Sequence, residues 1–186
     1  MKYPASHKEE IHQKLLVNAS EQIRDLGLGN VSVKSVMESE GMTVGGFYAH
    51  FDSKDDLLKA AIEYAFATTN IEFYDKIEKR TDASWNKKVI ERYLSDYHRD
   101  TISLSCPVAT LMSEVSRAND GIRAHFEKNL RILLKRFEPR VGKAKATGLF
   151  ALLSGGLLMA RSVEDEEYSD EILNACIKSA RALLKN

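Results

Sequence analysis

The chain has 186 residues, enough for one large domain or for a small domain joined to a larger one, with ample apolar content for a core. Lysine plus arginine balance aspartate plus glutamate at 27 each, so net charge neither favours nor excludes a polyanionic partner. Only three prolines and ten glycines interrupt the chain, too few for the closely spaced turns of an all-β fold. The composition therefore predicts an all-α protein.

The N-terminus is polar and charged, without the apolar centre of a secretory signal. The longest uncharged run, residues 146–160, is shorter than the roughly 20 residues that span a bilayer. Cys106 and Cys176 stand far apart and without metal-ligand spacing. The sequence thus predicts a cytoplasmic protein with buried, reduced thiols and with no membrane segment, metal or cofactor.

The first predicted helix covers about residues 6–26, where apolar residues recur at intervals of three and four. Ser32 is the expected N-cap of a short helix that ends at Gly41. Thr43 is expected to cap a second short helix that runs to about His50. The N-terminal part is therefore predicted as three helices, the last two joined by a tight turn.

A long helix over residues 53–79, capped by Ser53 with Asp56, is the predicted connector to the rest of the chain. The later helices are expected from Ser84 to about Tyr97, from Pro107, over 122–137 up to a stop at Pro139, over 143–163 and over 169–185. These make about nine helices, with no strand candidate and no repeat.

Residues 32–50 fit a helix-turn-helix, in which the second helix enters the DNA major groove and the first braces it. Gly45 and Gly46 lie in this second helix, although glycine costs about 1 kcal/mol relative to alanine in a helix interior. A surface without side chains lets the backbone approach either DNA or a neighbouring helix. Phe47 and Phe51 share a face and are expected to pack against the first helix.

The surrounding residues suit contacts to phosphate. Hydroxyl, imidazole and ammonium groups donate to phosphate oxygens, N-caps present free backbone N–H groups, and an apolar side chain can touch a thymine methyl. The DNA-binding candidates are Ser32, Lys34, Thr43, Val44, Gly45, Gly46, Tyr48, His50 and Lys54. Because residues 1–60 carry seven lysines or arginines against nine acids, affinity would depend on a few placed contacts and on dimerisation.

The segment VMESEGMTVGGFYAHF at 36–51, followed by DSKDDLL, resembles the signature of the tetracycline-repressor-like (TetR, AcrR-like) transcriptional regulators, and the match spans about residues 9–60. The resemblance implies a helix-turn-helix DNA-binding domain at 1–52 and a helical ligand-binding and dimerisation domain at 53–186. It also implies a homodimer that binds a palindromic operator in double-stranded DNA, most often as a repressor, and is released by a small-molecule effector. Such a protein is not an enzyme.

The middle helices carry aromatic, polarisable and hydrogen-bonding groups that suit a ligand pocket, although each is more often a core residue. The pocket candidates are Trp85, Tyr93, Tyr97, His98, Cys106 and Met112. The resemblance implies that the last two helices form the dimer, and small and apolar residues there suit close helix packing. The dimer candidates are Gly148, Leu149, Ala151, Leu152, Gly155, Leu157, Ile172 and Cys176, although residues 146–161 also fit an internal core helix.

Two other functions stay open at this stage. The acidic balance of the N-terminal unit favours a helical dimer whose helix-turn-helix binds protein rather than DNA. An all-α enzyme could use His98 as base and Cys106 as nucleophile, but the sequence offers no spacing for the third, orienting group that such a pair needs.

Overall fold

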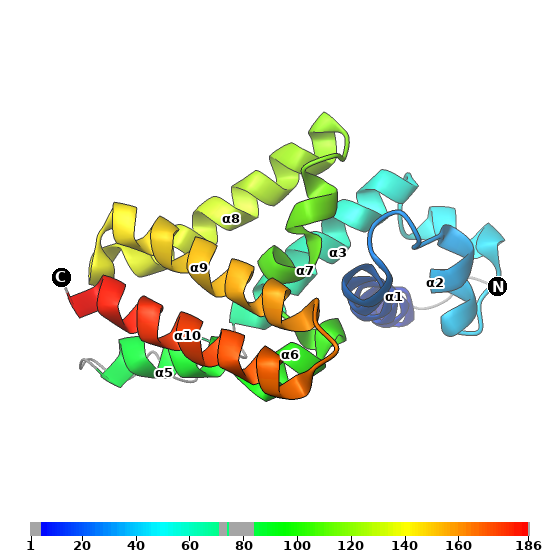
Figure 1. Cartoon of the computed structure of the whole chain (residues 1–186). Coiled ribbons are helices and arrows are strands. Elements are labelled where there is room, and N and C mark those ends of the chain that lie inside the picture. The colour runs from blue at the N-terminus through cyan, green and yellow to red at the C-terminus, as the bar shows by residue number, and fades with distance from the viewer. Residues whose placement is uncertain (1–4, 71–73, 75–83, 186) are drawn as a thin grey trace.

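A computed structural model describes residues 5–70, 74 and 84–185, and within them every regular element is helical (Figure 1). The expected all-α fold is therefore confirmed for the described part of the chain. The N-terminal unit contains α1 (Ala5–Leu26), α2 (Val33–Ser39) and the short 3-10 helix η1 (Val44–Ala49). Helix α3 (Lys54–Thr69) leads from this unit to the rest of the chain. Its predicted continuation to residue 79 lies outside the described residues, apart from Asn70 and Tyr74.

The larger part follows α3 and ends in three long helices. Its elements are α5 (Ser84–Tyr93), α6 (Asp96–Asp100), η3 (Ile102–Leu104), α7 (Pro107–Val115), α8 (Asp120–Val141), α9 (Lys143–Arg161) and α10 (Glu166–Lys185). Figure 1 shows α10 along α9 and beside α5, with α2 at the opposite end of the molecule.

The boundaries of the first helices follow the predicted caps. The Ser32 hydroxyl accepts from the backbone N–H of Ser35 at 2.9 Å, and the Ser53 hydroxyl accepts from that of Asp56 at 3.1 Å. At the other ends, Gly27 and Gly41 have φ values of 85° and 67°, which glycine adopts without a Cβ penalty. The predicted ends of the first two helices and the predicted N-caps of α2 and α3 are thus confirmed.

One continuous hydrophobic cluster joins the N-terminal unit to the larger part. Helix α3 packs against α1 on one side and against α7 and α8 on the other, so its buried face belongs to both halves. Deeper in the larger part, the Phe137 ring lies 4.6 Å from that of Phe150 and 5.2 Å from that of Trp85, measured between centroids. The N-terminal unit and the larger part therefore share one core through α3.

Three predictions of local structure are wrong. Residues 44–49 form a 3-10 helix rather than an α-helix, and Thr43 makes no side-chain capping hydrogen bond. Helix α8 runs through Pro139 to Val141, because a proline so close to the C-terminus removes only one hydrogen bond, and Gly142 with φ 82° ends it instead. The helix expected to reach Tyr97 breaks after Tyr93, where Ser95 caps a new helix, α6.

Candidate nucleic-acid interface

The turn between α2 and η1 directs η1 outward from the core. The backbone N–H of Met42 donates to the carbonyl of Met37 at 2.9 Å, which closes the turn around Gly41. Phe47 is almost fully buried, and the Phe51 ring stacks on His12 of α1 at 4.8 Å, so the expected packing of Phe51 against the first helix is confirmed. These anchors leave the opposite side of η1 to solvent.

That opposite side carries the side chains that sequence analysis assigned to DNA. Val44 is 44% exposed and Tyr48 is 75% exposed. Thr43 and Gly45 are exposed beside them. We call the exposed surface formed by Thr43, Val44, Gly45 and Tyr48 the η1 face. A surface of this kind could enter a groove.

The two glycines of η1 face different surroundings. A Cβ at Gly45 would meet only the Thr43 hydroxyl oxygen at 3.9 Å. A Cβ at Gly46 would lie 3.4 Å from the terminal methyl of Met37 and 3.6 Å from that of Met42, which is ordinary packing distance. Neither glycine has a positive φ. Gly45 therefore opens the η1 face, whereas Gly46 belongs to the seam between η1 and α2.

The cationic candidates flank the η1 face from neighbouring helices. Lys34 is exposed on the first turn of α2 and lies 3.8 Å from Glu38, and Lys54 is the exposed first residue of α3. Ser32 is also exposed, with its hydroxyl oxygen engaged by the α2 capping box. The backbone N–H groups at the starts of helices generally attract anions.

His50 is less available than the other candidates. Its ring stacks near that of His12, with centroids 6.0 Å apart, and its Nδ1 is buried without a hydrogen-bond partner in the described part of the chain. Burial, followed by the nearby His12 and Lys8, lowers the pKa of His50. The imidazole therefore favours its neutral form and offers a phosphate at most one N–H donor.

The pocket candidates separate into core and surface residues. Trp85, Tyr93 and Cys106 are fully buried, whereas Tyr97 is 64% exposed and Met112 is 43% exposed. Only Tyr97 and His98 line a common cavity, of about 230 Å³, between the N-terminal unit and the larger part. The rest of its wall comes from residues that sequence analysis missed, namely Arg24 of α1, Thr68 of α3, Arg92 of α5, Thr101 and Leu104.

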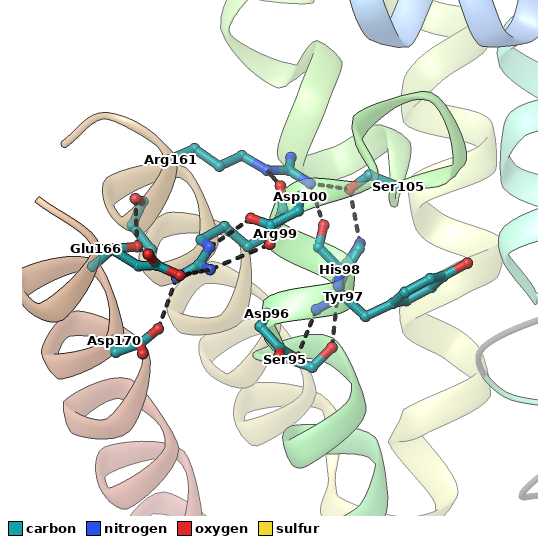
Figure 2. A network of polar contacts seen from close by, with 12 residues as sticks. Ser95, Asp96, Tyr97, His98, Arg99, Asp100, Ser105, Arg161, Glu166 and Asp170 are labelled. Atoms are coloured by element: carbon teal, nitrogen blue, oxygen red, sulfur yellow. Dashed lines mark hydrogen bonds and ion pairs between the residues drawn. The ribbon is translucent and has the colours of Figure 1, made fainter. Parts of the chain in front are cut away.

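His98 lines this cavity and belongs to the polar network drawn in Figure 2. Its Nδ1 donates to the Tyr93 carbonyl at 2.6 Å, and its Nε2 accepts from the Cys106 backbone N–H at 3.0 Å and from the Ser105 hydroxyl at 2.8 Å. Burial lowers the pKa of His98 to about 4, against the opposing effect of the Tyr93 hydrogen bond. The ring is therefore neutral at pH 7 and held in one tautomer.

The same network argues against the hypothesis that His98 acts as a base and Cys106 as a nucleophile. Both nitrogens of His98 are engaged by backbone groups, and the Cys106 side chain has no exposed surface. Burial raises the pKa of the Cys106 thiol, which keeps it protonated and weakly nucleophilic. His98 and Cys106 are thus placed as structural groups beside the cavity.

Two arginines from distant parts of the chain meet at Ser105. The Arg161 guanidinium donates to the Ser105 hydroxyl at 2.9 Å, to the Arg99 carbonyl at 2.9 Å and to the His98 carbonyl. The Arg24 guanidinium donates to the Ser105 carbonyl at 3.2 Å. This Ser105 cluster, consisting of Arg24, His98, Ser105 and Arg161, ties α1 to α6 and α9.

The dimer candidates do not share one surface. Leu149 and Leu157 lie in the core of the chain itself, so the prediction that they contact a partner is wrong. Cys176 is half-buried, and a Cβ at Gly156 would collide with it, which places it at the seam between α9 and α10. By contrast, Gly148 and Ala151 are exposed, and Leu152, Gly155 and Ile172 are partly so.

The described residues contain no helix that is long and apolar enough to cross a membrane. Within the same residues no three histidine, cysteine or acidic side chains converge as metal ligands would.

Residues 15–61 match the family model of the bacterial regulatory proteins of the tetR family. The chain is 22% identical over 165 residues to an uncharacterized HTH-type transcriptional regulator in the lacX 3′ region of Lactococcus lactis subsp. lactis, a match to 82% of this chain and 84% of that one. It is 23% identical over 200 residues to the HTH-type transcriptional regulator YfiR of Bacillus subtilis, a match to 99% and 95% of the two chains.

The fold also matches that of solved structures. The transcriptional regulator of the TetR family from Cytophaga hutchinsonii superposes with a TM-score of 0.74 at 19% identity, over 97% of this chain and 98% of that chain. The family model covers the helix-turn-helix described above, from the middle of α1 into α3. Residues 15–61 therefore form a helix-turn-helix domain of the tetR family of bacterial regulatory proteins, and the chain as a whole is similar in sequence to HTH-type transcriptional regulators and has the fold of a TetR-family regulator.

Proposed function

We propose that the chain is a ligand-responsive repressor that binds a palindromic operator as a homodimer, with the η1 face in the major groove. The observation that carries this proposal is the exposure of Val44, Gly45 and Tyr48 on η1, a helix that Phe47 anchors in the core. Residues 1–52 would form the DNA-binding domain and residues 53–186 the ligand-binding and dimerisation domain. The protein would act in the cytoplasm.

The contacts would divide into readout and positioning. Val44 offers a methyl surface to a thymine, and the open backbone at Gly45 allows close approach to the groove wall. Tyr48, Lys34 and Lys54 would donate to phosphates on either side of the groove. The backbone N–H groups at the starts of α2 and α3 would do the same. Thr43 and Ser32 would add hydroxyl or backbone donors, whereas half-buried His50 and the Gly46 seam would act mainly by holding η1 in place.

The homodimer would use the exposed part of α9 and α10. Gly148 and Ala151 present small residues on α9, and Leu158 and Met159 are 42% and 59% exposed further along the same helix. Ile172 lies partly exposed on α10. Exposed apolar side chains beside small residues support close packing against a second copy, and two copies would set the spacing of two operator half-sites.

The DNA contacts can be tested with operator fragments selected from genomic DNA by the purified protein. We expect Tyr48→Ala and Lys54→Ala each to weaken binding about tenfold, since single contacts to bases or phosphates contribute on the order of 1–3 kcal/mol. Fluorescence anisotropy at several salt concentrations measures this, and Lys54→Ala should also lower the salt slope by about one. Lys135→Ala, an exposed lysine on α8, is the matched control.

Full affinity in both folded variants would refute the assignment of the η1 face. Failure to select any specific fragment would instead favour a helix-turn-helix that binds protein. Dimerisation is tested separately by sedimentation of Ala151→Glu, which we expect to be monomeric.

A further inference from the structure

The cavity between the two halves of the molecule has an unusual charge balance. Arg24 and Arg92 line it, and no aspartate or glutamate is among the described residues of its wall. His98, the third titratable nitrogen group there, is neutral at pH 7 because burial lowers its pKa to about 4. The described wall is thus cationic, although the chain as a whole carries no net charge.

Arg24 carries the argument because it is only 5% exposed and yet not paired with an acid. Its Nε donates to the Ser20 carbonyl at 2.9 Å, its Nη2 to the Ser20 hydroxyl at 3.0 Å and its Nη1 to the Ser105 carbonyl at 3.2 Å. All three acceptors are neutral. In the described part of the chain no carboxylate oxygen lies within 4 Å of this guanidinium, and Glu21 and Asp25 attract it only from further away.

A guanidinium has five N–H donors, and the described contacts of Arg24 use three of them. One N–H on Nη1 and one on Nη2 remain, a pair that can bind both oxygens of a carboxylate. Burying a cation among neutral acceptors is costly, and burial accordingly lowers the pKa of Arg24. An anion in the cavity would offset that cost.

The second cation of the Ser105 cluster strengthens the argument. Arg161 also donates to neutral oxygens only, those of His98, Arg99 and Ser105. Two guanidinium groups therefore meet at Ser105 without a carboxylate in contact with either, as far as the described residues extend. Of the two, Arg24 lines the cavity itself, and in a space partly closed to water its attraction for an anion is stronger than on an open surface.

The remaining wall suits an organic molecule rather than an inorganic ion. Leu104 and the Tyr97 ring supply apolar area to the wall, and Thr68 and Thr101 supply methyl and hydroxyl groups. The volume of about 230 Å³ is below the roughly 300–1,000 Å³ of typical sites for drug-sized ligands. The occupant would therefore be small, with one charged end and one apolar end.

We propose that this cavity is the effector site and that its ligand is a small organic carboxylate, held by the two remaining Nη donors of Arg24 and attracted by Arg92. This inference rests on the proposed function, because it names the ligand class of a ligand-responsive regulator. Since Arg24 belongs to α1, such a ligand would touch the DNA-binding domain directly. The apolar end of the ligand would lie against Leu104 and the Tyr97 ring.

The test compares two probes of equal shape and different charge, 4-bromobenzoate and 4-bromobenzamide, against the full-length protein. We expect the acid to raise the midpoint of thermal unfolding with increasing concentration and the amide to leave it unchanged, because a ligand stabilises the native state by mass action. Isothermal titration calorimetry then gives the affinity. Inorganic phosphate at the same concentrations tests whether the charge alone suffices.

The variant pair is Arg24→Gln with Arg131→Gln as its control, because Arg131 is an exposed arginine of α8 remote from the cavity wall. Loss of a bidentate, charge-assisted contact should weaken 4-bromobenzoate about tenfold or more. Arg131→Gln should bind it as the original chain does. Should Arg24→Gln fail to fold, the anomalous signal of bromine in a crystal of the original chain soaked with the acid locates the apolar end of the ligand independently, and we expect it beside Leu104 and the Tyr97 ring.

Three outcomes would overturn the inference: equal binding of acid and amide, unchanged affinity in folded Arg24→Gln, or bromine density outside the cavity that Arg24, Tyr97 and Leu104 line. Binding of phosphate in place of the acid would overturn the assignment to an organic ligand. These measurements need no DNA, so their failure leaves operator binding by the η1 face intact. Conversely, a chain that binds the acid but selects no DNA fragment would refute the proposed function alone.

Discussion

On the η1 face, Tyr48 projects into solvent with most of its surface exposed and Gly45 has open space where a side chain would be. Around Ser105 the opposite holds, because Arg24, His98 and Arg161 are each fixed by several hydrogen bonds. The first region contributes little to the folded state and is free to meet a partner. The second holds α1, α6 and α9 together, so changes there should reach both stability and ligand response.

The largest expected effect concerns His98 and the pH dependence of stability. Its pKa is about 4 in the folded chain and about 6.5 when unfolded, so the unfolded state takes up a proton first as pH falls. The contribution of neutral His98 to the free energy of unfolding is fully present above pH 6.5. It is lost progressively as the pH falls toward 4, by about 3 kcal/mol in total. Urea denaturation at pH 7, 6 and 5 measures the slope.

His98→Gln supplies the comparison for that slope. Glutamine keeps one acceptor and one donor but does not titrate, so the variant should be less stable at pH 7 and should approach the original chain as pH falls. Parallel stability curves for the two proteins would contradict the assignment of the slope to His98. Neither protein should differ in DNA affinity at pH 7 beyond what the loss of stability explains.

An intermediate effect is expected where α1 meets α7. Gly27 has φ 85°, and a Cβ there would collide with the Glu114 carboxylate, which also accepts from the Gly29 N–H at 3.3 Å. Gly27→Ala should therefore lower the free energy of unfolding by about 1–2 kcal/mol through backbone strain and displacement of that carboxylate. Chemical denaturation checks the value.

Gly29→Ala is the matched control for this position. Gly29 has no positive φ, and a Cβ added to it would meet no atom of the described residues within 4 Å. The substitution should leave stability within about 0.5 kcal/mol of the original. Equal losses in the free energy of unfolding for Gly27→Ala and Gly29→Ala would show that backbone strain at Gly27 is not the cause of the loss.

The smallest effect on stability is expected at the η1 face itself. Gly45→Ala and Gly46→Ala should both be neutral or stabilising by up to about 1 kcal/mol, since neither position is crowded or strained. If the groove wall approaches Gly45, only Gly45→Ala should weaken operator binding. Fluorescence anisotropy with the selected operator fragment measures the affinity of each variant. Equal affinities of Gly45→Ala and Gly46→Ala would show that DNA does not approach Gly45 closely.

The sequence predicted the helices whose ends carry strong local signals. Ser32, Ser53, Gly27 and Gly41 cap their helices because short-range hydrogen bonds and backbone geometry act there without help from the rest of the fold. Residues 44–49 were assigned to the wrong kind of helix, because two glycines and a short length leave the choice between α and 3-10 geometry to tertiary packing.

The cavity could be predicted only in part. Tyr97 and His98 were named for their chemistry, whereas Arg24 was missed, although Leu16, Ser20 and Arg24 recur every four residues on the buried stripe of α1. A polar residue that continues an apolar stripe was the available signal. Leu149 and Leu157 illustrate the converse limit, because helical periodicity does not distinguish a face that packs within the chain from one that packs on a second copy.

The continuous core through α3 has a consequence for protein engineering. Because α1 and α8 both pack on α3, and Arg24 and Gly29 both reach across to the larger part, the two halves should melt in a single calorimetric transition. A hybrid regulator that joined this DNA-binding half to the sensor half of a relative would lose the contacts that Ser105 and Glu114 make with Arg24 and Gly29. Such grafts should recover cooperative melting only when the residues facing α1 are transplanted with it.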